Sequence, residues 1–174
     1  MEIKLLGRLT PLCFLPSNKL VCYKNGNIHV YDNGVCIDKF RIIFSFNELI
    51  LSRIKLLNRL FRFGIRSAIS LSENIIIISI GNNIREIDIK SRRISFGFQL
   101  SNGIRPLIFT EIKNIFGFDD GFYFGAYLSN PNRNPVSIYK RITKDFWQPI
   151  YTFDKGTINH IHNLIPDKFR NCVW

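Results

Sequence analysis

The sequence has little of what an exported or membrane-spanning protein needs. None of its apolar runs approaches the length of about 20 residues that a spanning helix requires. The N-terminal residues 1–6 lack the apolar core and the cleavage site of a signal peptide. These absences predict a soluble, cytoplasmic protein.

Cysteine and histidine are also scarce, with four and three residues. The cysteines, Cys13, Cys22, Cys36 and Cys172, match no zinc-ligand spacing, and each lies inside an apolar run. They therefore indicate buried thiols in a reducing compartment. We expect no cofactor.

Acidic residues are outnumbered by basic ones, 13 to 24, which gives a formal net charge of +11. A protein with such a charge could bind nucleic acid, an anionic membrane or an acidic ligand. Apart from a cluster within residues 53–66, however, the basic residues are scattered, and aromatic residues are not interleaved with them as stacking platforms would be. We therefore expect no nucleic-acid partner and interpret the charge as an unspecialised basic surface.

Aromatic and β-branched residues are abundant, including 16 Phe and 6 Tyr, and they favour an all-β fold. A repeat supports this prediction: residues 26–32 (GNIHVYD) are echoed by residues 81–88 (GNNIREID). In each copy Gly and Asn supply a tight turn, and a short strand ending in Asp follows. Each copy is therefore the second half of a hairpin.

The repeat extends to four strands per copy. The predicted strands are residues 12–15, 19–23, 26–32 and 40–43; 68–71, 74–80, 81–88 and 94–98; 114–118, 121–127, 136–140 and 149–153; then 160–164, a turn at 166–167, and 170–174. The pattern predicts a single incomplete β-propeller domain over residues 1–174, with about three and a half four-stranded blades. Their bounds are about 5–43, 65–100, 104–153 and, for the partial fourth blade, 157–174. Because an uncapped repeat exposes an unpaired strand, we expect self-association or a missing half to complete the ring.

Residues 47–63 interrupt the strand pattern with helical periodicity. Asn47 could cap the start of this helix and Gly64 its end. Its basic, amphipathic character leaves two alternatives, an apolar stripe packed on the side of the propeller or a helix lying on a membrane surface. We favour packing and do not expect membrane binding.

The third repeat ends in residues 138–153, with Trp147 near the start of its last strand. This segment resembles the Asp-box, or BNR, repeat of sialidase-like β-propellers, in which Ser-x-Asp-x-Gly-x-x-Trp joins the third and fourth strands of a blade. Trp147 holds the place of the Trp, whereas the Ser, Asp and Gly places fall at Arg141, Thr143 and Lys144 or Asp145. Residues 105–107, 127–131 and 156–163 also look like segments of glycosidase-like propellers, so the resemblance implies a ligand site in the funnel.

Four residues are candidates for that site. His160 and His162 alternate on a predicted strand, so both could face one ligand or metal. A zinc site needs a third ligand, however, for which the sequence offers only His29 and scattered carboxylates, so we expect no metal. The alternative role of the pair is hydrogen bonding between blades. Arg105 opens a strand at the rim and could bind an anionic sugar or simply be solvated, and Tyr127 lies in one of the resembling segments.

Fewer residues of the sequence support catalysis than support ligand binding. Glycoside hydrolysis needs two carboxylates facing a cleft, or a Tyr nucleophile with Glu and an arginine triad. Glu111, Asp119 and Asp120 are available, but Asp119-Asp120-Gly121 is typical of a hairpin turn, and Ala126 stands where the resemblance implies an acidic residue. The sequence therefore predicts a non-catalytic propeller fragment that binds a carbohydrate-like ligand or a protein. The alternatives are a fragment of a glycoside hydrolase and a scaffold with a basic membrane- or partner-binding helix.

Overall fold

The computed structural model describes residues 9–42, 64–95, 97–101 and 103–174. Within these ranges every regular secondary-structure element is a β-strand, which confirms the all-β prediction. The helix predicted for residues 47–63 lies outside the described residues.

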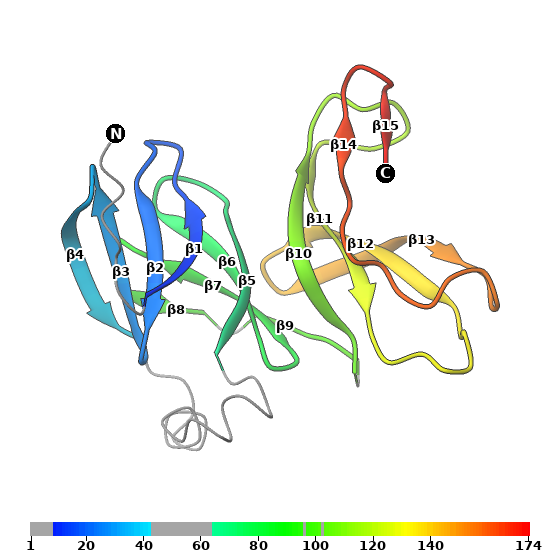
Figure 1. Cartoon of the computed structure of the whole chain (residues 1–174), viewed down its shortest axis with the longest axis horizontal. Helices are drawn as coiled ribbons and strands as arrows, with labels where there is room; N and C mark the ends of the chain where they lie inside the picture. The colour runs from blue at the N-terminus through cyan, green and yellow to red at the C-terminus, as the bar shows by residue number, and fades with distance from the viewer. Residues whose placement is uncertain (1–8, 43–63, 96, 102) are drawn as a thin grey trace. The chain divides into compact units, whose positions relative to one another are not determined.

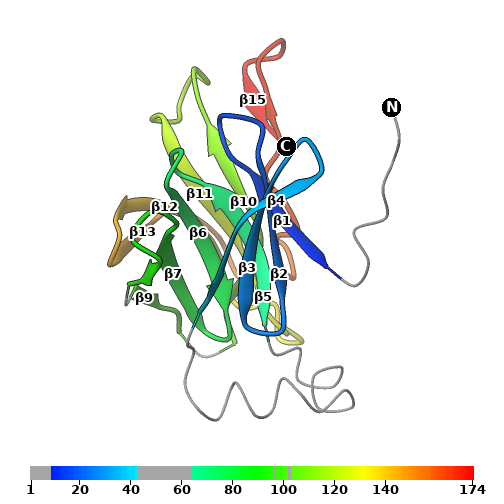
Figure 2. The ribbon, with the colours of Figure 1, turned by 90° about the vertical axis from the view of Figure 1, so that its left-hand side faces the viewer.

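The first sheet is a four-stranded antiparallel meander in which neighbours in sequence are neighbours in space. Its order can be followed in Figures 1 and 2, where the colour passes from blue to cyan. Its strands are β1 (Thr10–Phe14), β2 (Leu20–Lys24), β3 (Asn27–Asp32) and β4 (Val35–Arg41). Asn25-Gly26 and Asn33-Gly34 join them with positive φ at both positions, as a tight hairpin turn requires.

Two further sheets repeat this sequential order. One contains β5 (Ile65–Ser70), β6 (Ile75–Ile80), β7 (Asn83–Asp88) and β8 (Arg93–Ile94), with β9 (Phe98–Gln99) also paired to β7. The other contains β10 (Arg105–Ile112), β11 (Gly121–Tyr127), β12 (Val136–Thr143) and β13 (Phe146–Phe153). A two-stranded hairpin, β14 (Pro166–Asp167) and β15 (Cys172–Val173), follows.

The chain forms two compact units. Unit 1 contains residues 1–81 and 86–95, and unit 2 contains residues 82–85 and 96–174, so the boundary falls within β7.

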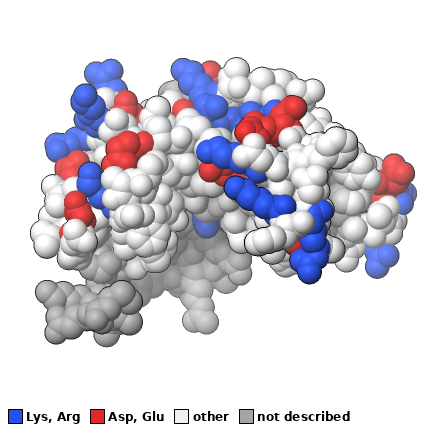
Figure 3. All heavy atoms as spheres, turned by 90° about the horizontal axis from the view of Figure 1, so that it is seen from above, with Lys and Arg blue, Asp and Glu red and all other residues white. Residues whose placement is uncertain are grey.

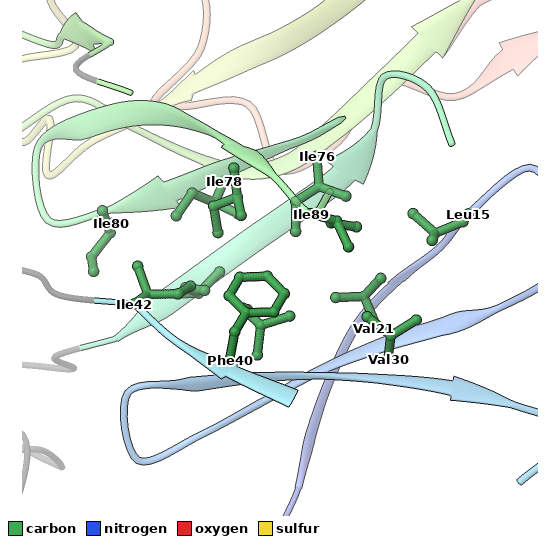
Figure 4. Close-up of a cluster of buried hydrophobic side chains, with 12 residues drawn as sticks. Leu15, Val21, Val30, Phe40, Ile42, Ile76, Ile78, Ile80 and Ile89 are labelled. Carbon is green, nitrogen blue, oxygen red and sulfur yellow. The ribbon is translucent and has the colours of Figure 1, made fainter. Parts of the chain in front are cut away.

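Unit 1 is built around an aliphatic core between its two sheets. Side chains of β2, β3 and β4 meet those of β6, and Figure 4 shows Val21, Val30 and Phe40 pointing toward Ile76 and Ile78. Such packing follows from the period of two along a strand, which sends alternate side chains to one face. Each fully buried aliphatic side chain stabilises the fold by about 1.5–3 kcal/mol.

Polar contacts join the loops of the two sheets of unit 1. The Glu73 carboxylate accepts hydrogen bonds from the backbone N–H and the hydroxyl of Ser17, and the Lys19 Nζ lies 3.5 Å from it. The Arg92 guanidinium is 2.9 Å from the Asp38 carboxylate. Both ion pairs are partly exposed, so each contributes little beyond fixing the loops.

Unit 2 has one large sheet, β10–β13, with different residues on its two faces. On one face Phe109, Phe124 and Trp147 form an aromatic cluster, in which the Phe124 and Trp147 ring centroids are 5.2 Å apart. On the other face Ile112, Tyr123 and Ile138 pack with Leu164 of the C-terminal segment. Both faces of this sheet are therefore buried around its centre.

Three sequence-based assignments in unit 2 were wrong. The first strand of the third repeat is β10, not residues 114–118, because Asn114 and Gly117 adopt positive φ and residues 115–118 close a tight turn with an isolated bridge between Ile115 and Phe118. Residues 160–164 form no strand, because Ile161 and Leu164 pack on the face of the sheet. Pro166-Asp167 is a strand rather than a turn, and the chain reverses at residues 168–171.

The cysteines agree in part with the sequence-based prediction of buried thiols. Cys22 is buried, but Cys36 is exposed because its position on β4, an outer strand of its sheet, leaves the side chain uncovered. Burial and the neighbouring Cys22 raise the pKa of Cys13 to about 12.

Figure 3 shows basic groups interspersed with acidic ones on the face in view. No helix in the described residues is long and apolar enough to cross a membrane.

Candidate ligand-binding site

The candidate site lies in unit 2, where β10 begins and β11 ends. Arg105 is the first residue of β10, Tyr127 is the last of β11, and the two are direct cross-strand partners. The strands are antiparallel, so the start of one meets the end of the other at the same edge. The Arg105 guanidinium carbon lies 5.2 Å from the centroid of the Tyr127 ring, within range of a cation–π interaction.

A β-bulge places Arg105 on this side of the sheet. Between Pro106 and Phe109 the register shifts, because Phe109 lies four positions after Arg105 on β10 whereas Tyr127 lies three positions after Phe124 on β11. In a regular strand, two residues four positions apart point to the same face, so Arg105 would share the face of Phe109 and the buried aromatic cluster if the bulge did not absorb the extra residue. The bulge thus keeps the guanidinium away from that cluster and beside Tyr127.

The segment that carries the two histidines rests on β11 through Ile161. The Ile161 N–H donates to the Ala126 carbonyl over 3.0 Å. Gly125 makes this approach possible, since a Cβ atom at that position would stand 2.1 Å from Cγ2 of Ile161. The absent side chain therefore leaves a notch that Ile161 fills, which fixes the residues on either side of it.

His160 and His162 both lie against Tyr127. Their ring centroids are 4.5 and 5.4 Å from that of Tyr127. The two Nε2 atoms are 2.9 Å apart, a hydrogen-bonding distance. One nitrogen must donate and the other accept, so the bonded pair shares one proton between the two Nε2 positions.

A hollow of about 450 Å³ opens beside these residues, and we call it the Tyr127 hollow. Its lining comprises Arg105, Tyr127, Leu128, Ser129, Asn130, Pro131, Arg133, Asn159 and His160. Two of these nine residues are arginines and none is acidic. Because the walls carry positive charge only, the hollow favours an anionic ligand.

Buried Asn130 holds the walls of the hollow together. Its Nδ2 donates to the carbonyls of Asn134 and Asn159 over 2.8 and 3.0 Å, and its Oδ1 accepts from the Asn134 N–H. One side chain thus joins the loop 128–135 to the histidine segment. Backbone contact continues at Arg133, whose carbonyl accepts the Gly156 N–H.

The structure brings together all four residues that the sequence nominated, Arg105, Tyr127, His160 and His162. Sequence reasoning missed Arg133, Asn130 and Asn159. The available signal was the loop 128–135 itself, since a basic residue between two prolines directly after a site strand is a candidate for the rim of a pocket.

The carboxylates considered for catalysis lie at the opposite end of the β10–β11 hairpin. Glu111 pairs with Lys113, with 2.7 Å between oxygen and nitrogen, and Asp119 pairs with Lys140 over the same distance. The hydrogen bond from Lys140 lowers the pKa of the Asp119 carboxyl. Asp120 accepts from the Asn114 N–H in the turn. At about 3.3 Å per residue along a strand, the length of β10 separates these acids from the Tyr127 hollow.

No protein-family model matches this sequence, and no curated protein is similar to it.

Proposed function

We propose that this chain is part of a sialidase-like β-propeller and that its Tyr127 hollow binds an acidic carbohydrate without cleaving it. The observation that carries the proposal is the composition of the hollow: two arginines, a histidine and an aromatic ring, with no acidic side chain in its lining.

The propeller assignment is supported by repetition. Three successive sheets, of four, five and four strands, each contain four strands in the sequential order of a propeller blade. Trp147, which holds the Trp place of the Asp-box pattern, follows the turn between the third and fourth strands of its sheet and is 2% exposed. Two faces of neighbouring sheets pack together in unit 1, as blades do.

The ligand class is supported by chemistry. Guanidinium groups bind carboxylates and other oxyanions through strong, charge-assisted hydrogen bonds. Tyr127 offers an aromatic surface, and Ser129, Asn159 and His160 supply polar groups suited to sugar hydroxyls. A carbohydrate that carries an acidic group combines these requirements.

The absence of a lining carboxylate supports binding rather than hydrolysis. A glycosidase places two carboxyl groups, or a Tyr and Glu pair, at the bond it cleaves. In the described residues, Glu111, Asp119 and Asp120 are all occupied at the far end of the hairpin.

Calorimetric titration with matched sugars tests this proposal. We expect sialylated and uronic-acid oligosaccharides to bind and their neutral counterparts, such as lactose against sialyllactose, to bind much more weakly. Arg105→Gln removes a charge-assisted hydrogen bond of about 1.5–3 kcal/mol, which corresponds to a loss of affinity of about tenfold to hundredfold.

Arg170→Gln is the matched control, because Arg170 also belongs to unit 2 but pairs with Asp167 on the terminal hairpin. It should bind as the unaltered chain does. Equal binding of acidic and neutral sugars, or full affinity in Arg105→Gln, would overturn the proposed ligand class. Release of free sugar from the bound oligosaccharide would show an enzyme instead.

A further inference from the structure

The two imidazoles of His160 and His162 converge on one point. Their Nε2 atoms are 2.9 Å apart, and their rings are inclined at 64° with centroids 4.7 Å apart. His160 is half-buried and His162 is exposed, so the point between the two nitrogens is reached from solvent.

Contacts with β11 and with the ring of Tyr127 fix this arrangement. Ile161, between the two histidines, is fixed by its hydrogen bond to the Ala126 carbonyl and by the notch at Gly125. The ring of Tyr127 supports both imidazoles from one side. A pair of donor groups that is already oriented loses little conformational entropy on binding.

The separation of the two nitrogens fits a metal ion with ligands at right angles. With metal–nitrogen distances of about 2.0–2.1 Å, two imidazole nitrogens are about 2.9 Å apart at a right angle and about 3.3 Å apart at a tetrahedral angle. Ni²⁺ and Cu²⁺ adopt square-planar or tetragonal geometries, whereas zinc prefers a tetrahedron. The separation of the two nitrogens therefore already matches such an ion, and the rings need only turn to direct both lone pairs toward it.

We propose that His160 and His162 chelate a divalent transition-metal ion of right-angled geometry, Ni²⁺ or Cu²⁺, at the edge of the Tyr127 hollow. This revises the expectation from sequence, which required a third protein ligand. The described residues contain no cluster of three or more His, Cys, Asp and Glu side chains that could hold a metal ion. Water or an anion completes the coordination, and the ion exchanges readily.

Proton and charge balance are consistent with such a site. The Nε2 proton that the pair now shares moves to Nδ1 of the same ring, so both Nε2 lone pairs become available without a change in net charge. Arg105 and Arg133, which line the hollow together with His160, oppose a bare dication. They favour an anion as the additional ligand.

A calorimetric titration of the untagged chain with Ni²⁺ tests the site. Ni²⁺ is the preferred probe because the chain contains four free thiols, which Cu²⁺ would oxidise. We expect one Ni²⁺ per chain, and we expect His160→Gln and His162→Gln each to weaken binding by about tenfold or more. Zn²⁺ should bind more weakly than Ni²⁺.

His29→Gln is the control, because the third histidine lies in unit 1 with its Nδ1 4.0 Å from the Cys36 sulfur and could bind metal on its own. It should leave Ni²⁺ affinity unchanged. In the unaltered chain, Ni²⁺ whose tetragonal coordination is completed by water or an anion is paramagnetic, and it should broaden the backbone amide signals of Ile161 and Tyr127 and spare those of β2 and β3. Full affinity in both histidine variants, loss of affinity in His29→Gln, or broadening confined to unit 1 would each overturn the proposal.

Discussion

Unit 1 and unit 2 bury different kinds of side chain. The core of unit 1 is almost entirely isoleucine and valine, packed between two sheets, and its polar contacts are partly exposed at the surface. The sheet of unit 2 carries aromatic rings on one face, and an irregular segment lies on the other. The aliphatic core of unit 1 therefore provides stability, whereas the irregular segment of unit 2 brings polar side chains together.

The sharpest test of this comparison is a cavity in the aliphatic core. Ile78→Ala removes a fully buried side chain from unit 1 and should lower the free energy of unfolding by about 2–5 kcal/mol. Ile37 belongs to the same unit but is 53% exposed, so Ile37→Ala should change it by only about 0.5 kcal/mol. Urea denaturation followed by circular dichroism measures both. Equal effects would show that the core of unit 1 is not packed as described.

A second prediction concerns the notch in unit 2. Gly125→Ala places a methyl group against Ile161, and we expect it to cost about 1–3 kcal/mol of stability through overpacking. Because Ile161 positions His160 and His162, the variant should also lose both sugar and Ni²⁺ binding. A Gly125→Ala chain that keeps its far-UV spectrum and full Ni²⁺ affinity would separate the histidine pair from the notch.

The smallest expected effect lies in the loop contacts of unit 1. The hydrogen bond from the Ser17 hydroxyl, its N–H and the nearby Lys19 lower the pKa of Glu73. A carboxyl whose pKa is depressed by folding stabilises the protein above its unfolded value of about 4.3, and this contribution is lost as the pH falls toward the folded value. Since the pair is exposed, the loss should stay below about 1 kcal/mol.

Denaturation at pH 7 and pH 3 measures this contribution. Glu73→Gln and Ser17→Ala should each reduce the difference in stability between the two pH values, since Glu73→Gln removes the titrating carboxyl and Ser17→Ala removes the hydroxyl that donates to it. An unchanged difference in both variants would show that this contact does not form in solution.

The fold of unit 1 was the more predictable from sequence. Gly26, Asn27 and the short strand after them are local signals that predicted a hairpin, and the structure contains it with its turn at Asn25-Gly26. In unit 2 the apolar run at 115–118 was misleading, because the positive φ of Gly117 turns the chain there. The strand predicted to open at Arg105 is β10, but it was not recognised as the first strand of the third repeat, because Pro106 interrupts its pattern near the start, where the bulge also lies.

The candidate site was predictable only where single residues stand out. Arg105, Tyr127 and the two histidines could be nominated from their positions along the chain. Arg133 had only the signal of a basic residue between two prolines, and Asn159 had none, because Asn130 joins their segments through a hydrogen bond that spans 29 residues. Contacts of that kind depend on how loops close, and no periodicity in the sequence encodes them.

The most direct test of the account uses the three imidazole signals of the chain in a carbon–proton correlation spectrum. Two of these signals come from unit 2, and the third, from His29, comes from unit 1. On titration with an acidic oligosaccharide, the account predicts that the His160 and His162 signals shift together and saturate while the His29 signal stays in place. A shift confined to His29, or no shift in any of the three with all the acidic sugars, would contradict it.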